Sequence, residues 1–274
     1  MSNKNISEDD YTLFSEFLER TCGIVLGPTK QYLVRSRLAP LMRKYDYSSL
    51  SQVINDVING RNRALRDCAI DAMTTNETLW FRDKYPFELL HTDLLPKFKG
   101  NRQAVKIWCA AASSGQEPYS IAMIASEYQR SNPGFAGVQI VGTDLSTEML
   151  QKSKDGVYDS LSLSRGLSEE RKRQFFDDTD NSSKKVKSDL KRMVSFKQLN
   201  LLDSYATMGK FDIVFCRNVL IYFDKEMKKR VIKAFYDILN HGGYLMLGEA
   251  ESLHGISSAF KVEHFPGAFV YRKE

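Results

Sequence analysis

Hydrophobic residues in the first 73 positions recur at the spacing of an amphipathic helix. Three stretches, residues 11–18, 50–57 and 65–73, each place their apolar side chains on one face. Residues that favour helix ends flank these stretches, because a side-chain oxygen can bond the first free N–H groups and glycine can adopt a left-handed end. These are Ser7 before the first stretch, Gly23 after it, and Gly60 after the second. The pattern predicts an all-α domain over residues 1–73.

From residue 105 onward, short apolar runs alternate with helical segments. The runs cover residues 105–109, 138–142, 194–196, 211–216 and 244–247. Such alternation is typical of an α/β fold in which helices cover both faces of a parallel sheet. Residues 157–193 interrupt the pattern, since they are polar and carry an acidic run followed by a basic run. We interpret this stretch as an insertion.

The composition limits the class of protein. A chain of 274 residues with 42% hydrophobic content can bury a full core, and its length suggests one large domain and a small one. The start is polar, and no apolar run approaches the roughly 18 residues that span a bilayer, so we expect a cytoplasmic protein with no signal peptide. The four scattered cysteines predict neither a metal site nor disulfides. A net charge of +5 permits an acidic partner without specifying nucleic acid.

The loop after the first predicted strand has the character of a ligand site. Residues 110–115 are small, Gly115 can adopt a positive φ, and Pro118 suits the first turn of the helix that follows. Helix N-termini attract anions, yet Glu117 would repel a pyrophosphate and could instead hold an ammonium group. This pattern points to an amino-acid-bearing nucleotide such as S-adenosylmethionine. The alternative is a strand-to-helix turn whose glycine serves packing alone.

Polar residues also follow three other predicted strands, where ligands collect in such sheets. Asp144 could accept hydrogen bonds from ribose hydroxyls, or it could cap a helix. Asn200 and Leu201 could contact an adenine ring, or they could form an ordinary turn. Arg217 and Asn218 could meet the cofactor or the substrate, or they could lie in a solvated turn.

Several motifs in order along the chain resemble the chemotaxis receptor methyltransferases, the CheR family. They are Thr75-Asn76-Glu77-Thr78 with Phe81-Arg82, the loop Gly115-Gln116-Glu117-Pro118-Tyr119-Ser120, Thr143-Asp144, Asn200-Leu201-Leu202, and the run from Phe215 to Phe223. The resemblance spans nearly the whole chain. It implies S-adenosylmethionine-dependent methyl transfer to glutamate side chains on membrane chemoreceptors.

The same resemblance implies a division of the chain. Residues 1–73 would form a helical N-terminal domain that recognises the receptor, and residues 74–83 a linker that contributes to the active site. Residues 84–274 would form a Rossmann-like S-adenosylmethionine domain, with a small antiparallel β subdomain inserted at about residues 157–193.

Carried over by position, nine residues would surround the cofactor. They are Asn76, Thr78, Arg82, Glu117, Asp144, Asn200, Leu201, Arg217 and Asn218. Two residues are candidates for groups near the transferred methyl: Arg82, which could instead hold the cofactor's carboxylate, and Tyr222, which could instead serve packing. A glutamate side chain with an ordinary pKa of about 4.3 is already ionised at neutral pH, so the reaction needs no general base. Alignment and exclusion of water are then the main demands on the protein.

A basic stripe is a candidate surface for the receptor. Lys30, Arg37 and Lys44 recur every seven residues, and no acidic residue lies between the first and the last of them. An acidic receptor helix could dock there, although a solvated basic face would show the same pattern and Pro40 would kink a continuous helix. The resemblance favours docking, because Arg37 and Arg43 fall where family members carry arginines proposed to meet the receptor.

The chain departs from the family pattern at three places. Some members grip a C-terminal receptor peptide through a glycine-containing loop of the inserted subdomain, but here residues 177–183 contain no glycine. We therefore expect recognition of the receptor's helical region without this peptide tether. Gln116 replaces an acidic residue common in the loop, and Gly248-Glu249-Ala250-Glu251 stands where Gly-His-Ser-Glu is more usual.

Two other functions are compatible with parts of the sequence. A nucleic-acid methyltransferase would suit the pI of 8.9, but its Asp-Pro-Pro-Tyr-like motif does not occur after the fourth strand. A non-catalytic S-adenosylmethionine sensor or scaffold, or an enzyme with another methyl acceptor, remains an alternative. We expect no nucleic-acid partner, no metal and a monomer.

Overall fold

The computed structural model describes residues 6–180, 182–266 and 268–274, which form two compact units. One unit, here the helical unit, contains the chain up to Thr75 together with Tyr222–Met227. The other, here the sheet unit, contains Asn76–Ile221 and Lys228–Glu274.

The helical unit has the caps that the sequence predicts. Ser7 Oγ accepts a hydrogen bond from Asp10 N at 3.1 Å, and Gly23 and Gly60 end two helices with φ values of 78° and 66°. The buried faces of the helices carry the predicted apolar residues. The helices are α1 (Glu8–Cys22), α2 (Gln31–Lys44), α3 (Leu50–Asn59) and α4 (Arg63–Met73).

Helix α2 runs without a break through Pro40 to Lys44. Its Arg37 has a clear structural role, because the guanidinium closes the C-terminal end of α4. It donates to Met73 O at 2.7 Å, to Thr74 O at 3.0 Å and to Thr75 Oγ1 at 3.2 Å. One member of the predicted basic stripe therefore satisfies carbonyls within its own unit.

A late segment of the chain completes the helical unit. Val25 N donates to Tyr222 O at 3.2 Å, and Phe223 packs against the turn after α1. A Cβ at Gly23 would lie 2.8 Å from the Phe223 ring, so this position accepts only glycine without rearrangement. Tyr222 thus belongs to the helical unit, although the residues just before it belong to the sheet unit.

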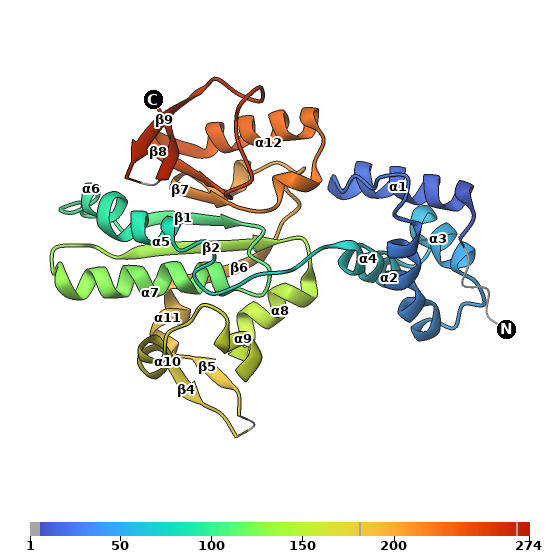
Figure 1. The fold of residues 1–274 in the computed structure, drawn as a ribbon, viewed down its shortest axis with the longest axis horizontal. Helices are drawn as coiled ribbons and strands as arrows, with labels where there is room; N and C mark the ends of the chain where they lie inside the picture. The colour runs from blue at the N-terminus through green and yellow to red at the C-terminus, as the bar shows by residue number, and fades with distance from the viewer. Residues whose placement is uncertain (1–5, 181, 267) are drawn as a thin grey trace. The chain divides into compact units, whose positions relative to one another are not determined.

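A seven-stranded mixed sheet forms the centre of the sheet unit, in the order β6-β2-β1-β7-β8-β10-β9 (Figure 1). The first five strands in this order are parallel, and β10 is antiparallel to both of its neighbours. The strands are β1 (Val105–Ala110), β2 (Val138–Asp144), β6 (Val194–Gln198), β7 (Phe211–Cys216), β8 (Leu239–Leu247), β9 (Phe260–Phe265) and β10 (Ala268–Lys273).

The five parallel strands confirm the sequence prediction, whereas the β9–β10 hairpin was not predicted. Strand β9 is an edge strand with charged residues at Lys261 and Glu263, and most of its positions are at least partly exposed. Such strands lack the continuous apolar run that identifies a buried parallel strand. A purely parallel sheet was therefore an incomplete prediction.

Helices cover both faces of the sheet, as expected (Figure 1). Ile107 and Cys109 share one buried core with Ile121 of α7, while Trp108 points the other way and meets Phe235 of α12 at a centroid distance of 5.2 Å. These alternating side chains fix the sheet between two layers. The helical segments are α5 (Tyr85–Leu89), a π-helical turn (Leu90–Leu94), α6 (Leu95–Lys97), α7 (Gln116–Ser131), α8 (Thr147–Asp155), two 3₁₀ turns (Ala206–Met208 and Leu220–Tyr222) and α12 (Lys225–Ile238), of which Lys228 onward lies in this unit.

The polar insertion folds as a small subdomain with its own antiparallel sheet, as the resemblance implied. Its strand order is β3-β5-β4. The elements are β3 (Val157–Tyr158), α9 (Ser160–Ser164), α10 (Glu169–Phe175), β4 (Phe176–Asp178), β5 (Lys184–Val186) and α11 (Ser188–Met193).

The segment before α5 supplies the central aromatic residue of this subdomain. The Trp80 ring packs edge-on against Tyr158 at 4.8 Å and against Phe176 at 5.4 Å. Gly166 passes so close that a Cβ there would lie 2.1 Å from Trp80 O. Arg171 stacks over the Phe81 ring at 4.0 Å and is paired with Glu127 of α7. The insertion and the linker therefore share one core.

Within the described residues, no helix is both long enough and apolar enough to cross a lipid bilayer. The four cysteines are free thiols. Burial raises the pKa of the Cys109 and Cys216 thiols well above its ordinary value, so both stay neutral and pack as small apolar groups.

Replacing Gly166 with alanine tests the shared core of linker and insertion. Gly166 has a φ of 93°, and the added methyl would collide with Trp80 O. We expect Gly166→Ala to lower the free energy of unfolding by at least about 2 kcal/mol. Both tryptophans lie in the sheet unit, so urea unfolding followed by tryptophan fluorescence reports this unit.

Gly134→Ala is the matched control, because nothing lies within 4 Å of the Cβ it would add. It should change stability by less than about 0.5 kcal/mol. Equal unfolding midpoints for the two variants would contradict the packing described here.

Candidate active site

The carboxyl ends of β1, β2, β6 and β7 meet along one edge of the sheet, where the strand order reverses. β1 pairs with β2 on one side and with β7 on the other, which places the topological switch point beside β1. Ligands of open α/β sheets bind at this place. The cofactor candidates outside the linker lie at these strand ends. Glu117 is in the first turn of α7, Asp144 ends β2, and the residues that follow β6 and β7 are Asn200, Leu201, Arg217 and Asn218.

The loop from β1 to α7 is held in an unusual conformation. Ala111, Ser113 and Gly115 have φ values of 64°, 49° and 94°, so the prediction for Gly115 is confirmed. Hydrogen bonds hold the loop in place: Ser153 Oγ donates to Ser113 O at 2.8 Å, and Tyr158 Oη donates to Ser114 O at 2.7 Å. Backbone strain of this kind persists only where the surroundings fix it, and it is common at ligand sites.

Asp144 at the end of β2 is buried against this loop. Its Oδ2 accepts from Ser113 N at 2.7 Å and its Oδ1 accepts from Ser146 N at 2.9 Å. The cap of α8 is Ser146 itself, whose Oγ accepts from Met149 N at 3.2 Å. Asp144 therefore orients the loop rather than capping the helix.

The loop after β6 lies beside Asp144. Leu199 N donates to Asp144 O at 3.0 Å, which places Asn200 next to the end of β2. Asn200 Oδ1 accepts from Leu202 N at 3.0 Å, and Leu201 is buried. These contacts form an ordinary turn, which was the alternative role of Asn200 and Leu201. The turn lies at the edge of the sheet where the other candidate residues gather.

A buried ion pair joins α7 to the end of β7. Arg217, only 6% exposed, donates from Nη1 to Glu117 Oε2 at 2.8 Å. Its Nη2 donates to Asp83 Oδ2 at 2.6 Å and to Arg82 O at 2.8 Å. Burial raises the pKa of the Glu117 carboxyl above its ordinary 4.5, and the neighbouring guanidinium of Arg217 opposes this shift. The Glu117 carboxylate is therefore already ion-paired with a cation of the protein.

The linker carries three further candidates, Asn76, Thr78 and Arg82. Asn76 O accepts from Ser113 Oγ at 2.8 Å, and Arg82 Nη1 donates to Glu77 O at 3.2 Å. Thr78 is half-buried between them in sequence. Phe81 and Asp83 have positive φ values of 49° and 66°, so the linker turns sharply around Arg82.

The structure links most of the predicted cofactor residues through short contacts. Ser113 joins Asn76 to Asp144, and Arg217 joins Glu117 to the backbone of Arg82. The other predicted residues belong to the helical unit. They are the catalytic candidate Tyr222 and the basic residues Lys30, Arg37, Arg43 and Lys44.

Three residues of the site were not predicted. Ser113 and Asp83 bond Asp144 and Arg217, which lie 31 and 134 positions away, so no sequence spacing identifies these contacts. Glu251 stands in the stretch 248–251, which departs from the family pattern and has no predicted role. Its carboxylate accepts hydrogen bonds from the loop after β7.

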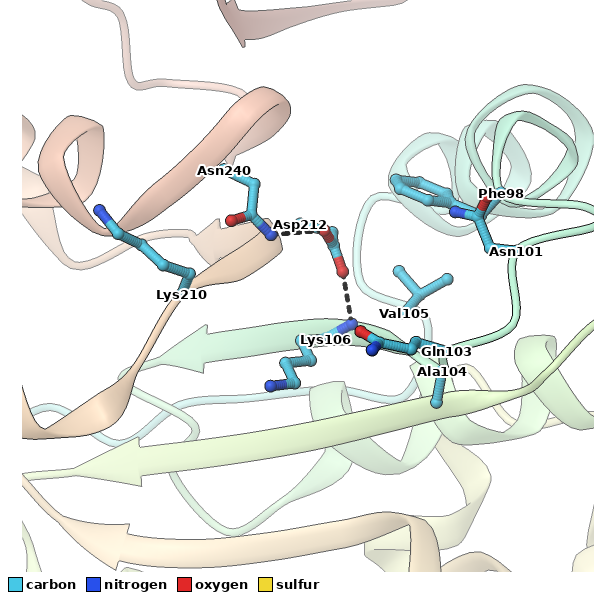
Figure 2. Close-up of a pocket in the computed structure, with 9 residues that line it drawn as sticks. All are labelled: Phe98, Asn101, Gln103, Ala104, Val105, Lys106, Lys210, Asp212 and Asn240. Carbon is cyan, nitrogen blue, oxygen red and sulfur yellow. Dashed lines mark hydrogen bonds between the residues drawn. The ribbon is translucent and has the colours of Figure 1, made fainter.

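A cavity of about 270 Å³ lies at the opposite edge of the sheet, where β1 and β7 begin (Figure 2). Its central carboxylate, Asp212, accepts from Lys106 N at 2.8 Å and from Asn240 Nδ2 at 2.7 Å. The Asp212 carboxylate is thus hydrogen-bonded within the protein. The described residues that line this cavity include none of the predicted site residues.

Comparison with known families identifies the class of protein, an S-adenosylmethionine-dependent methyltransferase. Residues 76–268 match the family described as "CheR methyltransferase, SAM binding domain", and residues 9–74 match "CheR methyltransferase, all-alpha domain". The chain belongs to the CheR family of chemotaxis protein methyltransferases, and its activity is methylation of protein glutamate residues.

Close relatives share the full length of the chain. A chemotaxis protein methyltransferase of Vibrio parahaemolyticus is 55% identical over 273 residues, which cover 99% of each protein. Chemotaxis protein methyltransferase 1 of Vibrio cholerae is 52% identical over 99% of each. The protein of the same name from Pseudomonas aeruginosa is 49% identical over 96% of this chain and 97% of its own.

Substituting Arg217 with lysine tests the buried ion pair. Lysine keeps the charge but lacks the planar fork that reaches Glu117, Asp83 and Arg82 O together. We expect Arg217→Lys to lower the free energy of unfolding by about 2 to 4 kcal/mol in the tryptophan-monitored urea experiment.

Arg165→Lys makes the same change in an exposed ion pair with Glu77. It should cost less than about 1 kcal/mol. A comparable loss of unfolding free energy in the two variants would mean that burial does not strengthen the contacts of Arg217.

Proposed function

We propose that this protein methylates glutamate side chains on the cytoplasmic helices of membrane chemoreceptors, using S-adenosylmethionine. The observation that carries the proposal is the Glu117 carboxylate at the N-terminus of α7, paired with Arg217 at the switch point of the sheet. An acidic group here disfavours a pyrophosphate and favours an amino-acid moiety. Full-length similarity to chemotaxis methyltransferases supports the choice of acceptor. The enzyme would act as a cytoplasmic monomer recruited to receptor arrays.

In this proposal each strand end holds a different part of the cofactor. Glu117 accepts from the methionine ammonium, Asp144 accepts from the ribose hydroxyls, and Asn200 with Leu201 borders the adenine. Asp144 suits this role because it is buried, fixed by two backbone N–H groups and located at the end of β2. The other residues around the cofactor are Asn76, Thr78, Arg82, Arg217 and Asn218.

The protein's contribution to the reaction is mainly alignment. The cofactor supplies a methyl group bound to a positively charged sulfur, and an ionised glutamate oxygen of the receptor accepts this methyl without a general base. The methyl–sulfur bond breaks, and neutral-sulfur S-adenosylhomocysteine is the product that leaves. Arg82 would orient the incoming carboxylate by a charge-assisted hydrogen bond, and Tyr222 would donate its hydroxyl near the reacting groups. Arg82 is held at a sharp turn by Arg217, which suits a residue that must keep one position.

Transfer of radiolabelled methyl groups to chemoreceptor-containing membranes tests this function. Label on the receptor that base releases as methanol would establish a carboxyl methyl ester. Arg82→Ala and Tyr222→Phe should each slow the transfer more than they weaken cofactor binding. Absence of label on receptors from the same cell, despite cofactor binding, would favour a sensor or another methyl acceptor.

The proposed ammonium contact predicts a pH dependence of cofactor affinity. Protonation of Glu117 removes the charge that attracts the ammonium. S-adenosylmethionine should therefore bind with full affinity above the pKa of Glu117 and lose affinity as pH falls through it. Because burial raises this pKa, the loss should occur above pH 4.5. Calorimetric titration of S-adenosylmethionine over a range of pH measures it. Glu117→Gln should bind weakly at every pH, and an unchanged pH profile in that variant would remove Glu117 from the cofactor site.

We further propose that the exposed basic residues of α2 and of its N-cap, Lys30, receive an acidic receptor helix. Lys30, Arg43 and Lys44 are exposed, whereas Arg37 is partly committed to the end of α4. Their contribution is expected to be electrostatic, and therefore to weaken as salt is added.

Charge reversal tests this surface. Arg43→Glu should raise the KM for receptor by about threefold to tenfold and leave the affinity for S-adenosylmethionine unchanged. Arg63→Glu makes the same charge change on α4, at a side chain that is 94% exposed, and should have little effect. Equal effects of the two variants would show that only net charge matters.

Recognition in this proposal does not use a C-terminal receptor peptide. The β4–β5 connection is short, since Thr179 N already donates to Ser183 O at 3.1 Å. A synthetic peptide with the C-terminal sequence of a receptor from the same cell should therefore show no binding by calorimetry and should not compete with receptor methylation. Saturable binding would refute tether independence while leaving the methyl transfer intact.

A further inference from the structure

The Glu251 carboxylate accepts four backbone hydrogen bonds, three from the loop that follows β7 and one from Gly248 after β8. Its Oε2 accepts from Gly248 N and Asn218 N, both at 2.8 Å. Its Oε1 accepts from Val219 N at 3.0 Å and from Leu220 N at 2.8 Å. The residue is 7% exposed, and all four donors are uncharged N–H groups. This is an anion-binding concavity of backbone amides, filled by a carboxylate of the same chain.

Three of these donors are consecutive, and they begin directly after Arg217. Asn218 adopts a left-handed φ of 59°, a conformation that asparagine tolerates better than most non-glycine residues. The Glu251 carboxylate holds the loop in this conformation through three consecutive N–H groups. The backbone on the carboxyl side of Arg217 is thereby fixed in position.

Arg217 transmits this constraint to the linker. Its guanidinium reaches Arg82 O at 2.8 Å and Asp83 Oδ2 at 2.6 Å, where the linker backbone takes positive φ values. The contacts thus run from Glu251 through the loop backbone and Arg217 to the segment that carries Arg82. A charge-assisted contact at each step makes this connection stiff.

We propose that Glu251 is a positioning residue for methyl transfer, which rests on the function proposed above. It contacts neither cofactor nor acceptor in this scheme, and it acts by fixing the loop of Asn218 and, through Arg217, the position of Arg82. Of the residues proposed to surround the cofactor, Asn218, Arg217 and Arg82 lie along this connection. Those proposed to hold the cofactor's ammonium, ribose and adenine lie at the ends of other strands. Loss of Glu251 therefore impairs turnover more than cofactor binding.

Glu251→Gln tests the proposal because it keeps the shape and removes the charge. The amide NH₂ would face two backbone N–H donors, so two of the four hydrogen bonds are lost. We expect kcat on receptor membranes to fall by about tenfold to a hundredfold. The Kd for S-adenosylmethionine should change by less than about threefold. Glu249→Gln is the matched control, since it makes the same change two residues away at an exposed side chain.

Gly248→Ala breaks the same connection without altering the carboxylate. The added Cβ would lie 2.8 Å from Glu251 Oε2 and 2.9 Å from Asn218 N. We expect a similar loss of kcat, and a double variant no worse than either single one, because both changes act on one contact. Should Glu251→Gln fail to fold, this variant carries the test.

Amide hydrogen exchange gives a readout that needs no acceptor. In Glu251→Gln, exchange should quicken at Asn218, Val219 and Leu220, and also in the linker at Phe81 and Lys84. If the parent protein is active and Glu251→Gln changes neither kcat nor exchange in the linker, the positioning role is wrong and the proposed function stands. An inactive parent refutes the proposed function, and the exchange experiment still decides whether Glu251 controls the linker.

Discussion

The buried guanidinium of Arg217 is the interaction on which the rest of the site depends. A cation removed from water needs several acceptors around it, and here Glu117, Asp83 and Arg82 O provide them from two separate elements. The three contacts bring together the end of β7, the start of α7 and the linker. Each of those elements also carries a residue that the proposed reaction needs. The contacts that stabilise the buried charge of Arg217 therefore also fix the positions of the site residues.

The parts of the fold that were predictable are those with a local signal. The apolar run of β7 and the caps of α1 come from residues close together in sequence, so periodicity and cap chemistry found them. Strand β9 lacked such a signal because its side chains at the sheet edge are charged. The small antiparallel sheet was predicted through family resemblance alone, since its three strands have only two or three residues each.

The candidate site shows the same division. Glu117 and Asp144 could be named from the sequence because each follows a recognisable strand, and their chemistry suits an amino-acid nucleotide. The contacts between site residues could not be predicted. Arg217 lies 100 residues from Glu117, and Glu251 lies 33 from Asn218, so only the folded chain shows that each pair is in contact. Long-range pairing of this kind leaves no periodic trace in a single sequence.

The position of Trp80 affects how the inserted subdomain can vary among relatives. Its ring is part of the subdomain's core, yet it lies in the chain long before the insertion begins. A chimaera that exchanged residues 157–193 alone would place a foreign sheet around a native tryptophan, and a foreign turn against Trp80 O at Gly166. The unit that can be inherited or transplanted as a module is thus discontinuous: it consists of the insertion together with the short segment that precedes α5.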